Sequence, residues 1–189
     1  FLGHRLHVPG AYLWRGLPRT ELAEQGAVWL MAWGPQLAPV TATQANDWFN
    51  ARPTGRRVVR MTMFGNPNFL HGQALLDAMT RDNRYESRDG ERDAHGFTVL
   101  RPRRADLSHR GEIHISPQGP EDLFNCALDG QFPNPSCTAR RWIGGPLRVE
   151  VEFSKSLLGE YPALSASSAG FFRCALGPHG VPGQVWPPR

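Results

Sequence analysis

The chain has 189 residues, 40% hydrophobic and 20% charged, with a formal net charge of +4 at pH 7. This composition excludes a disordered chain and is sufficient for a hydrophobic core. The longest apolar run, residues 27–33, is far shorter than the ~18 residues of a membrane-spanning helix. We therefore expect one domain over residues 1–189, or two merged lobes: a mixed α/β lobe over residues 1–95 and a β-rich lobe with a C-terminal helix over residues 96–189.

The positive charge comes almost entirely from arginine, because Lys155 is the only lysine. Arginines cluster at residues 56–60, 101–104 and 139–141, but acidic residues interleave with them across residues 81–93. Basic clusters are compatible with nucleic-acid binding, yet no known nucleic-acid-binding motif accompanies these. We therefore expect no nucleic-acid partner.

The first half of the chain begins with a buried strand and a short helix. Residues 27–33 (AVWLMAW) are apolar without alternation, which predicts a strand buried on both faces. Thr41 and Gln44 have the spacing of a capping box, which predicts a helix over residues 42–50. On that helix, one side would carry Ala45, Trp48 and Phe49.

A second strand and a second helix follow. Residues 56–64 alternate, with Val59, Met61 and Met63 on one face, so we predict a half-exposed strand. Asn68 is a candidate N-cap for a helix extending to about residue 83, with Leu75, Leu76 and Met79 as its apolar stripe. The polar residues 82–96 predict a surface loop.

The second half is dominated by strand patterns, at residues 97–100, 112–116, 122–128, 137–143 and 147–154. Residues 144–146 (GGP) would join the last two as an antiparallel hairpin. Ser154 can cap a terminal helix that Pro162 would interrupt. Together the elements predict an α+β fold, a mainly antiparallel β-sheet with two or three helices packed on it.

Two of the three cysteines, Cys126 and Cys137, flank the segment ALDGQFPNPS. Their spacing does not favour a zinc site, and no motif of a catalytic cysteine surrounds them. If they end adjacent antiparallel strands, their sulfurs can meet in a disulfide, which implies an oxidising compartment such as the periplasm. A bond from Cys174 to either one stays open; otherwise Cys174 would be a buried free thiol.

Motifs of the common hydrolases, metalloproteases and nucleotide-binding proteins do not occur in the sequence. We therefore predict no enzyme activity, no catalytic residues, no metal site and no cofactor. The alternative is an envelope enzyme or small-ligand-binding protein with an unrecognised site. It predicts a deep pocket in which His71, His95 or His114 lies near Asp77 or Asp93.

Three segments carry a resemblance to a known family: HVPGAYL at residues 7–13, WLMAWGPQLAPV at residues 29–40, and residues 115–164. Their pattern resembles small envelope proteins of Gram-negative bacteria that are associated with toxic effectors of the type VI secretion system. The resemblance rests on Val8, Pro9, Tyr12, Leu13, Pro35, Pro39, the Cys126–Cys137 segment and the strand-to-helix passage ending near Tyr161. It departs from the family pattern at Tyr161 and Pro162, where a tryptophan is expected.

The resemblance implies a periplasmic immunity protein that binds and neutralises a cognate secreted toxin; some such proteins are paired with phospholipase effectors. It also implies membrane anchoring, for which a signal peptide or lipid anchor would precede Phe1. Arg140, Arg141 and Trp142 are candidate contacts to the toxin, because arginine and tryptophan are common interface anchors. A structural role in a secretion apparatus or pilus is a further hypothesis.

Overall fold

The computed structural model describes residues 8, 12–13, 27–65, 68, 70–81, 84–103, 111–144 and 147–176. Over these residues, nine strands form one antiparallel sheet in the order β2-β1-β3-β9-β8-β7-β6-β5-β4. The same residues contain three α-helices and two 3-10 helices. The α+β fold predicted from the sequence is therefore confirmed. No helix within the described ranges is long and apolar enough to cross a membrane.

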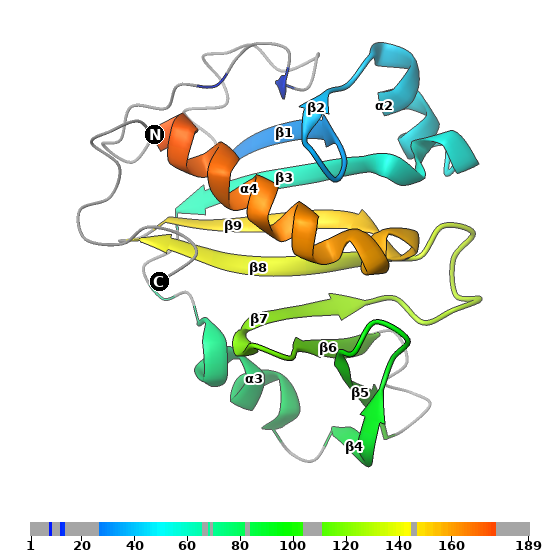
Figure 1. The fold of residues 1–189 in the computed structure, drawn as a ribbon, viewed down its shortest axis with the longest axis vertical. Coiled ribbons are helices and arrows are strands. Elements are labelled where there is room, and N and C mark those ends of the chain that lie inside the picture. The colour runs from blue at the N-terminus through cyan, green and yellow to red at the C-terminus, as the bar shows by residue number, and fades with distance from the viewer. Residues whose placement is uncertain are drawn as a thin grey trace.

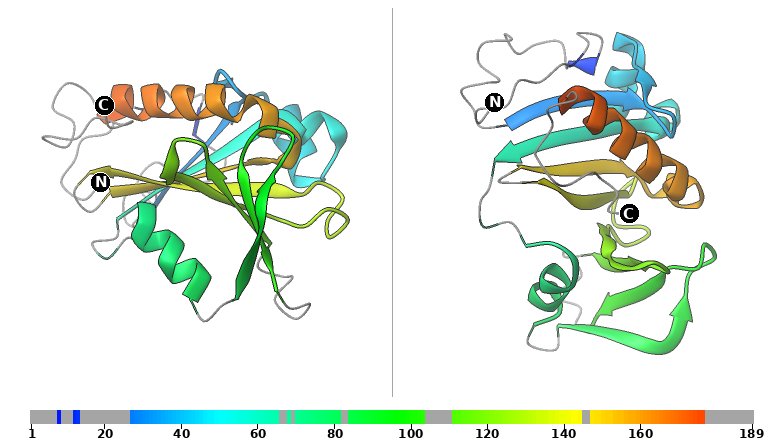
Figure 2. Two further views of the ribbon diagram at one scale, coloured as in Figure 1. Left: turned by 60° about the horizontal axis from the view of Figure 1, so that its bottom comes forward. Right: turned by 60° about the vertical axis from the view of Figure 1, so that its left-hand side comes forward.

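The helices lie on both sides of the sheet. The strands are β1 (Ala27–Trp33), β2 (Ala38–Pro39), β3 (Val58–Gly65), β4 (Tyr85–Arg92), β5 (Thr98–Pro102), β6 (Glu112–Ser116), β7 (Gly119–Cys126), β8 (Ser136–Gly144) and β9 (Leu147–Ser154). The helices are α2 (Ala42–Phe49), α3 (Gly72–Thr80) and α4 (Tyr161–Leu176), with the 3-10 helices η2 (Pro53–Arg57) and η5 (Lys155–Glu160). In Figure 1, α4 crosses in front of β1, β3, β9 and β8. Figure 2 shows α3 on the opposite side.

The main core lies between α4 and the sheet. Alternation along β9 places four apolar side chains, Leu147, Val149, Val151 and Phe153, on the buried face, each at most 2% exposed. From α4 and its first turn, Tyr161, Leu164 and Phe172 pack into the same cluster. Burial of these apolar side chains is the main stabilising contribution to the contact between α4 and the sheet.

A smaller core lies on the opposite face, under α2. The predicted capping box is present, because Thr41 Oγ1 accepts from the backbone N–H of Gln44 at 3.2 Å and the Thr41 N–H donates to Gln44 Oε1 at 2.8 Å. Ala45 packs with Met31 of β1 and Val58 of β3. Phe49 was expected on this apolar side, but it is 47% exposed at the last residue of α2.

Three expectations about element boundaries were wrong. Residues 82–96 are not one loop, because β4 occupies most of them and pairs with β5 at the edge of the sheet. An edge strand is held by backbone hydrogen bonds and needs few apolar side chains, so the polar sequence of β4 contains no recognisable strand pattern. The second helix begins at Gly72 instead of following Asn68. In the terminal helix, Pro162 lies in the first turn, where its missing N–H costs nothing.

Strand β3 is also more buried than predicted. It begins at Val58, because Arg56 and Arg57 belong to η2. Val58 is fully buried and Thr62 is 7% exposed, although both lie on the face expected to meet water. The pairing of β3 between β1 and β9 and the packing of α2 against Val58 explain the difference. Of Val58, Arg60 and Thr62, the three alternating side chains expected on that face, only Arg60 is exposed.

The joint between β7 and β8 is short. Only three residue pairs join these strands, Phe124↔Ala139, Asn125↔Thr138 and Cys126↔Cys137, whereas eight pairs join β8 to β9. Beyond the three pairs, Arg141 of β8 forms an ion pair with Asp122 of β7. Arg141 also donates to the hydroxyl of Tyr161 and, at 3.0 Å, to Ser165 Oγ. One buried guanidinium therefore connects β7, β8 and α4.

We predict that Arg141→Ala lowers the free energy of unfolding by ~3–5 kcal/mol, because it leaves the Asp122 carboxylate at the joint without its counter-charge. Arg140→Ala is the matched control, since Arg140 is a neighbour in sequence whose side chain is 38% exposed and pairs with Glu150. That change should cost about 1 kcal/mol or less. Denaturant unfolding of the purified variants measures both values, and equal losses would contradict the assignment.

Candidate protein-binding site

A disulfide joins β7 to β8 at the end of their short ladder. Cys126 and Cys137 are directly paired in the register, with an S–S distance of 2.03 Å, and both are fully buried. The predicted bond is therefore present. Cys174 is a free thiol on α4, but it is exposed, which corrects the expectation of a buried one. The two paired sulfurs are structural and do not form a reactive or metal-binding pair.

The bond closes a segment that we call the tethered loop, residues 127–135. At its base, the Ala127 N–H donates to the Ser136 carbonyl at 2.9 Å. Within it, the Gln131 N–H donates to the Leu128 carbonyl at 3.2 Å. At its return, Ser154 Oγ donates to Asn134 Oδ1 at 2.8 Å, and the Lys155 N–H donates to the Pro135 carbonyl at 2.8 Å. The loop is thus held from within, from its base and from the start of η5.

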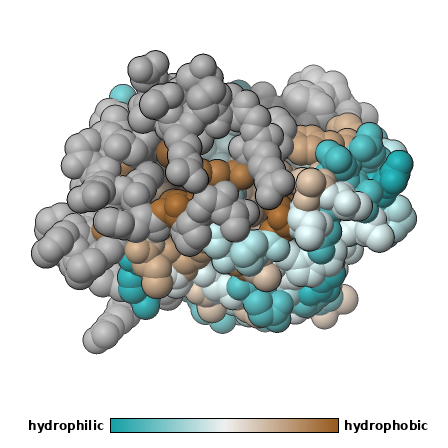
Figure 3. Space-filling model, turned by 90° about the horizontal axis from the view of Figure 1, so that it is seen from above, coloured by the Kyte–Doolittle hydropathy of each residue, from teal (hydrophilic) through white to brown (hydrophobic). Residues whose placement is uncertain are grey.

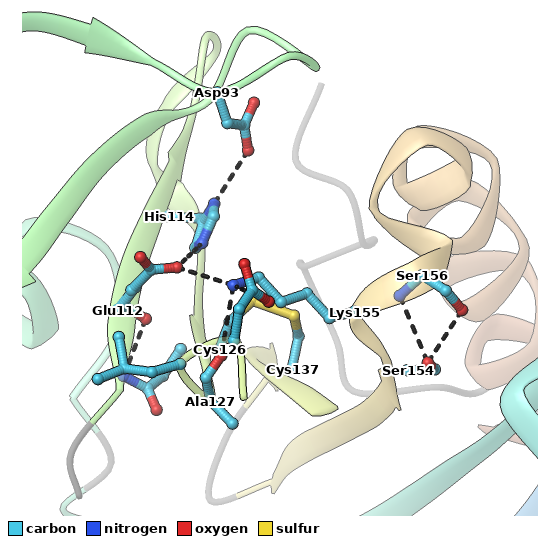
Figure 4. Close-up of a disulfide and its surroundings, with 12 residues drawn as sticks. Asp93, Glu112, His114, Cys126, Ala127, Cys137, Ser154, Lys155 and Ser156 are labelled. Carbon is cyan, nitrogen blue, oxygen red and sulfur yellow. Dashed lines mark hydrogen bonds and ion pairs between the residues drawn. A yellow bond between two sulfur atoms is a disulfide. The ribbon is translucent and has the colours of Figure 1, made fainter. Parts of the chain in front are cut away.

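A buried group of charged side chains supports the same loop from the core side (Figure 4). Lys155 Nζ lies 3.0 Å from Glu112 Oε2, 3.0 Å from Asp129 Oδ1 and 3.4 Å from the Ala127 carbonyl oxygen. His114 continues the group, with Nε2 3.4 Å from Glu112 Oε2 and Nδ1 3.1 Å from Asp93 Oδ2. Lys155 therefore connects β6 to the tethered loop. Sequence reasoning identified it only as the single lysine.

The electrostatics of this group depend on Glu112. Its carboxylate accepts from His114 and from Lys155, and at 3.0 Å from Arg101 Nε. These hydrogen bonds outweigh the effect of burial and lower the pKa of Glu112 to about 2. The pKa of Lys155 is raised, because its contacts with Glu112 and Asp129 outweigh the opposing effect of burial.

The histidines of the enzyme hypothesis do not converge on one cleft. His114 does contact Asp93, but it is 2% exposed and its ring stacks on Phe124, with the ring centroids 5.3 Å apart. His95 lies against Gly159, and His71 stacks on Trp142. Over the described parts of the chain, no group of three or more His, Cys, Asp or Glu side chains could hold a metal ion. The expected proximity of His114 to Asp93 is therefore present, but inside the buried group, whereas His71 lies elsewhere, beside Trp142.

The three candidate contact residues on β8 do not share one surface. Arg141 faces α4 and is buried. Arg140 and Trp142 lie on the other face, where Arg140 Nε donates to Glu150 Oε1 at 3.1 Å and Trp142 stacks on the His71 ring at 5.1 Å. Arg141 therefore does not belong to a contact surface with the other two. Arg140 and Trp142 lie on the face opposite α4, which we call the open sheet face, and each contacts a neighbouring side chain.

A different exposed residue was missed by sequence reasoning. Phe132, in the tethered loop, is 56% exposed, more than any other large hydrophobic residue in the described chain. The others are Trp29 at 36%, Phe49 at 47% and Leu70 at 47%. Seen from above (Figure 3), the end of the molecule that carries α2 is mainly hydrophilic, with apolar side chains visible nearer the middle. Pro133 follows Phe132 in the tethered loop and restricts the backbone conformation there.

A shallow depression of about 340 Å³ lies beside the tethered loop. Its lining comes from η2, the loop and the start of η5: Arg56, Asp129, Asn134, Pro135, Ser154, Lys155, Ser156 and Leu158. Arg57, next to Arg56, donates two hydrogen bonds to the Glu160 carboxylate, at 2.9 and 3.0 Å, which fixes η2 against η5. The tethered loop, η2 and η5 thus meet around this depression.

Comparison with known proteins identifies the fold. No protein-family model matches the sequence, and no curated protein matches it. The structure is similar to that of Smlt3025, an immunity protein of the Stenotrophomonas maltophilia type IV secretion system. The TM-score is 0.57 and the sequence identity 12%, over 88% of this chain and 87% of that one. The chain therefore shares the fold of that structure.

We predict that replacing Cys126 and Cys137 together by alanine lowers the free energy of unfolding by ~2–3 kcal/mol, because the unfolded chain loses its closed loop. Native-state hydrogen exchange should accelerate most in β7 and the tethered loop. Cys174→Ser, at an exposed position, is the control and should change stability by ~0.5 kcal/mol or less. Wild-type exchange rates in β7 of the double variant would contradict the role of the bond.

We predict that Glu112 makes stability depend on acid pH. Because its folded pKa of about 2 lies below its ordinary value of 4.5, it stabilises the fold above pH 4.5 and loses this effect as the pH falls toward 2. At pH 7, Glu112→Gln should lower the free energy of unfolding by on the order of 2–3 kcal/mol, and the difference from wild type should shrink below pH 4.5.

Denaturant unfolding from pH 7 to pH 3 measures this difference. Glu150→Gln is the control, since Glu150 is 24% exposed and pairs with the exposed Arg140. A wild-type advantage over Glu112→Gln that stays constant over this range would contradict the prediction.

Proposed function

We propose that this chain is an immunity protein that binds and neutralises a cognate toxin delivered by a bacterial secretion system. The observation that carries the proposal is the likeness of the fold, over 88% of the chain, to an immunity protein of a secretion system. The sequence resemblance to envelope immunity proteins supports the same role independently. The Cys126–Cys137 disulfide supports residence in the periplasm, because such bonds persist in oxidising compartments.

Two relationships bear on the finer identity of the toxin, and they point to different secretion systems. The sequence resemblance favours an effector of the type VI secretion system, including a phospholipase, whereas the structural neighbour belongs to a type IV secretion system. We propose a toxin that acts in the periplasm or on its membranes, because an immunity protein must reside where its toxin acts. The purified complex identifies the toxin, and with it the secretion system.

Inhibition by binding requires a rigid surface and few anchors. The main core, the Arg141 network and the disulfide supply rigidity. Arg140 and Trp142 remain our proposed contacts on the open sheet face, whereas Arg141 acts inside the fold. Their existing partners, Glu150 and His71, hold the two side chains in defined positions before any complex forms.

The test is co-expression with the product of the neighbouring gene, exported to the periplasm of a heterologous bacterium. We expect this chain, exported likewise, to restore growth and to co-purify with the toxin. The matched control is the same chain retained in the cytoplasm, which should protect poorly because it is separated from the toxin. Continued killing without co-purification would overturn the proposal, and co-purification with secretion or pilus components alone would favour the structural role.

A further inference from the structure

We propose that Phe132 is the apolar anchor with which this chain enters a pocket of its cognate toxin, and that Arg56 pairs with a carboxylate at the rim of that pocket. This inference rests on the proposed function and names the surface that carries it out. The partner it fits is a protein with an aromatic-sized apolar pocket and an adjacent acidic side chain.

The first argument is exposure. A phenyl ring that remains 56% exposed leaves much of its apolar surface in water, and a pocket in a partner would remove that surface from water. The rest of the tethered loop is polar or consists of proline and glycine, apart from the half-buried Ala127 and Leu128. Phe132 is therefore the one apolar side chain that the loop presents outward.

The second argument is rigidity. The disulfide, the hydrogen bonds within the loop and the contacts of Lys155 with Asp129 and Ala127 hold the loop before it meets a partner. A preorganised loop loses little conformational entropy on binding, so more of the contact energy appears as affinity. An aromatic residue on such a support has the properties of an interface hot spot.

The third argument is charge. Beside the loop, Asp129 is already paired with Lys155, and Arg57 with Glu160. Arg56 is exposed on the same depression and, within the described residues, has no ion pair. The surface beside the tethered loop therefore offers one guanidinium without an ion pair among the described residues. A carboxylate on the partner would pair with the Arg56 guanidinium and fix the orientation in which the partner binds.

The experiment measures the dissociation constant of the toxin from the neighbouring gene, made inactive by substitution of its catalytic residue, by titration calorimetry. Phe132→Ala should raise the dissociation constant about 30-fold or more, as for a hot-spot residue. Leu70→Ala is the matched control, because Leu70 is similarly exposed but lies beside α3, outside this surface. It should change the constant by about twofold or less.

Two further measurements test the contacts of Arg56 and of Phe132 separately. Arg56→Glu should weaken binding about tenfold, and the loss should diminish at high salt, because an exposed ion pair is screened. Benzoylphenylalanine in place of Phe132 should cross-link to the toxin on irradiation, whereas the same group in place of Leu70 should not. Thermal unfolding verifies that each variant is folded, which the exposure of these side chains leads us to expect.

The outcomes distinguish this inference from the proposed function. If wild type binds the toxin and Phe132→Ala binds within about twofold of it, with no cross-link from position 132, the anchor is elsewhere and only the inference fails. If wild type itself does not bind, the proposed function and this inference both fail. A 30-fold loss in Phe132→Ala with Leu70→Ala unchanged supports both.

Discussion

The continuity of the sheet depends on the short joint between β7 and β8. Three residue pairs join these strands, and they are the backbone connection within the sheet between β4–β7 and the α4-covered strands. Three interactions reinforce the joint: the disulfide at its end, the Arg141–Asp122 ion pair beyond it, and the packing of Phe124 on Tyr161, with ring centroids 4.4 Å apart. A covalent, an ionic and an apolar contact thus act at one place.

The same joint places the surface that we assign to binding. The tethered loop begins and ends at the two bonded cysteines, so its position is a direct consequence of the β7–β8 register. Lys155 adds a second connection, from Glu112 in β6 to the loop. Its compact ammonium contacts three oxygens in different directions, whereas the planar fork of arginine suits a flat carboxylate such as Glu160. In a chain otherwise rich in arginine, the single lysine lies where one cation contacts three oxygens in different directions.

Periodicity predicted the elements whose side chains alternate or are capped. The strands at residues 112–116 and 147–154 and the capping box at Thr41 follow the sequence because local pattern and burial agree there. β4 was missed because backbone pairing at the edge of a sheet leaves no apolar pattern. Val58 was placed in water because the covering helix, α2, is a tertiary contact that no strand pattern contains.

The candidate site likewise has a part that the sequence predicted and a part that it did not. The Cys126–Cys137 pair could be inferred, because a turn-rich segment between two strand patterns brings its ends together. A shared contact surface could not be inferred for Arg140, Arg141 and Trp142, because these residues alternate between the faces of β8 and the middle one is buried. The exposure of Phe132 depends on which parts of the molecule leave the loop uncovered, and a sequence window does not contain that information.

Charge on the open sheet face is largely balanced within the molecule. Arg60 pairs with Glu152 and Arg140 with Glu150, so these cross-strand pairs neutralise each other along β3, β9 and β8. A partner that docked there would have to compete with existing pairs, at the cost of exchanging one ion pair for another. Beside the tethered loop, the exposed Arg56 has no ion pair with any residue that the structure describes, and burial of Phe132 against a partner would remove apolar surface from water. The two surfaces differ in what a partner can add, and this difference favours the loop as the primary anchor and the sheet face as its periphery.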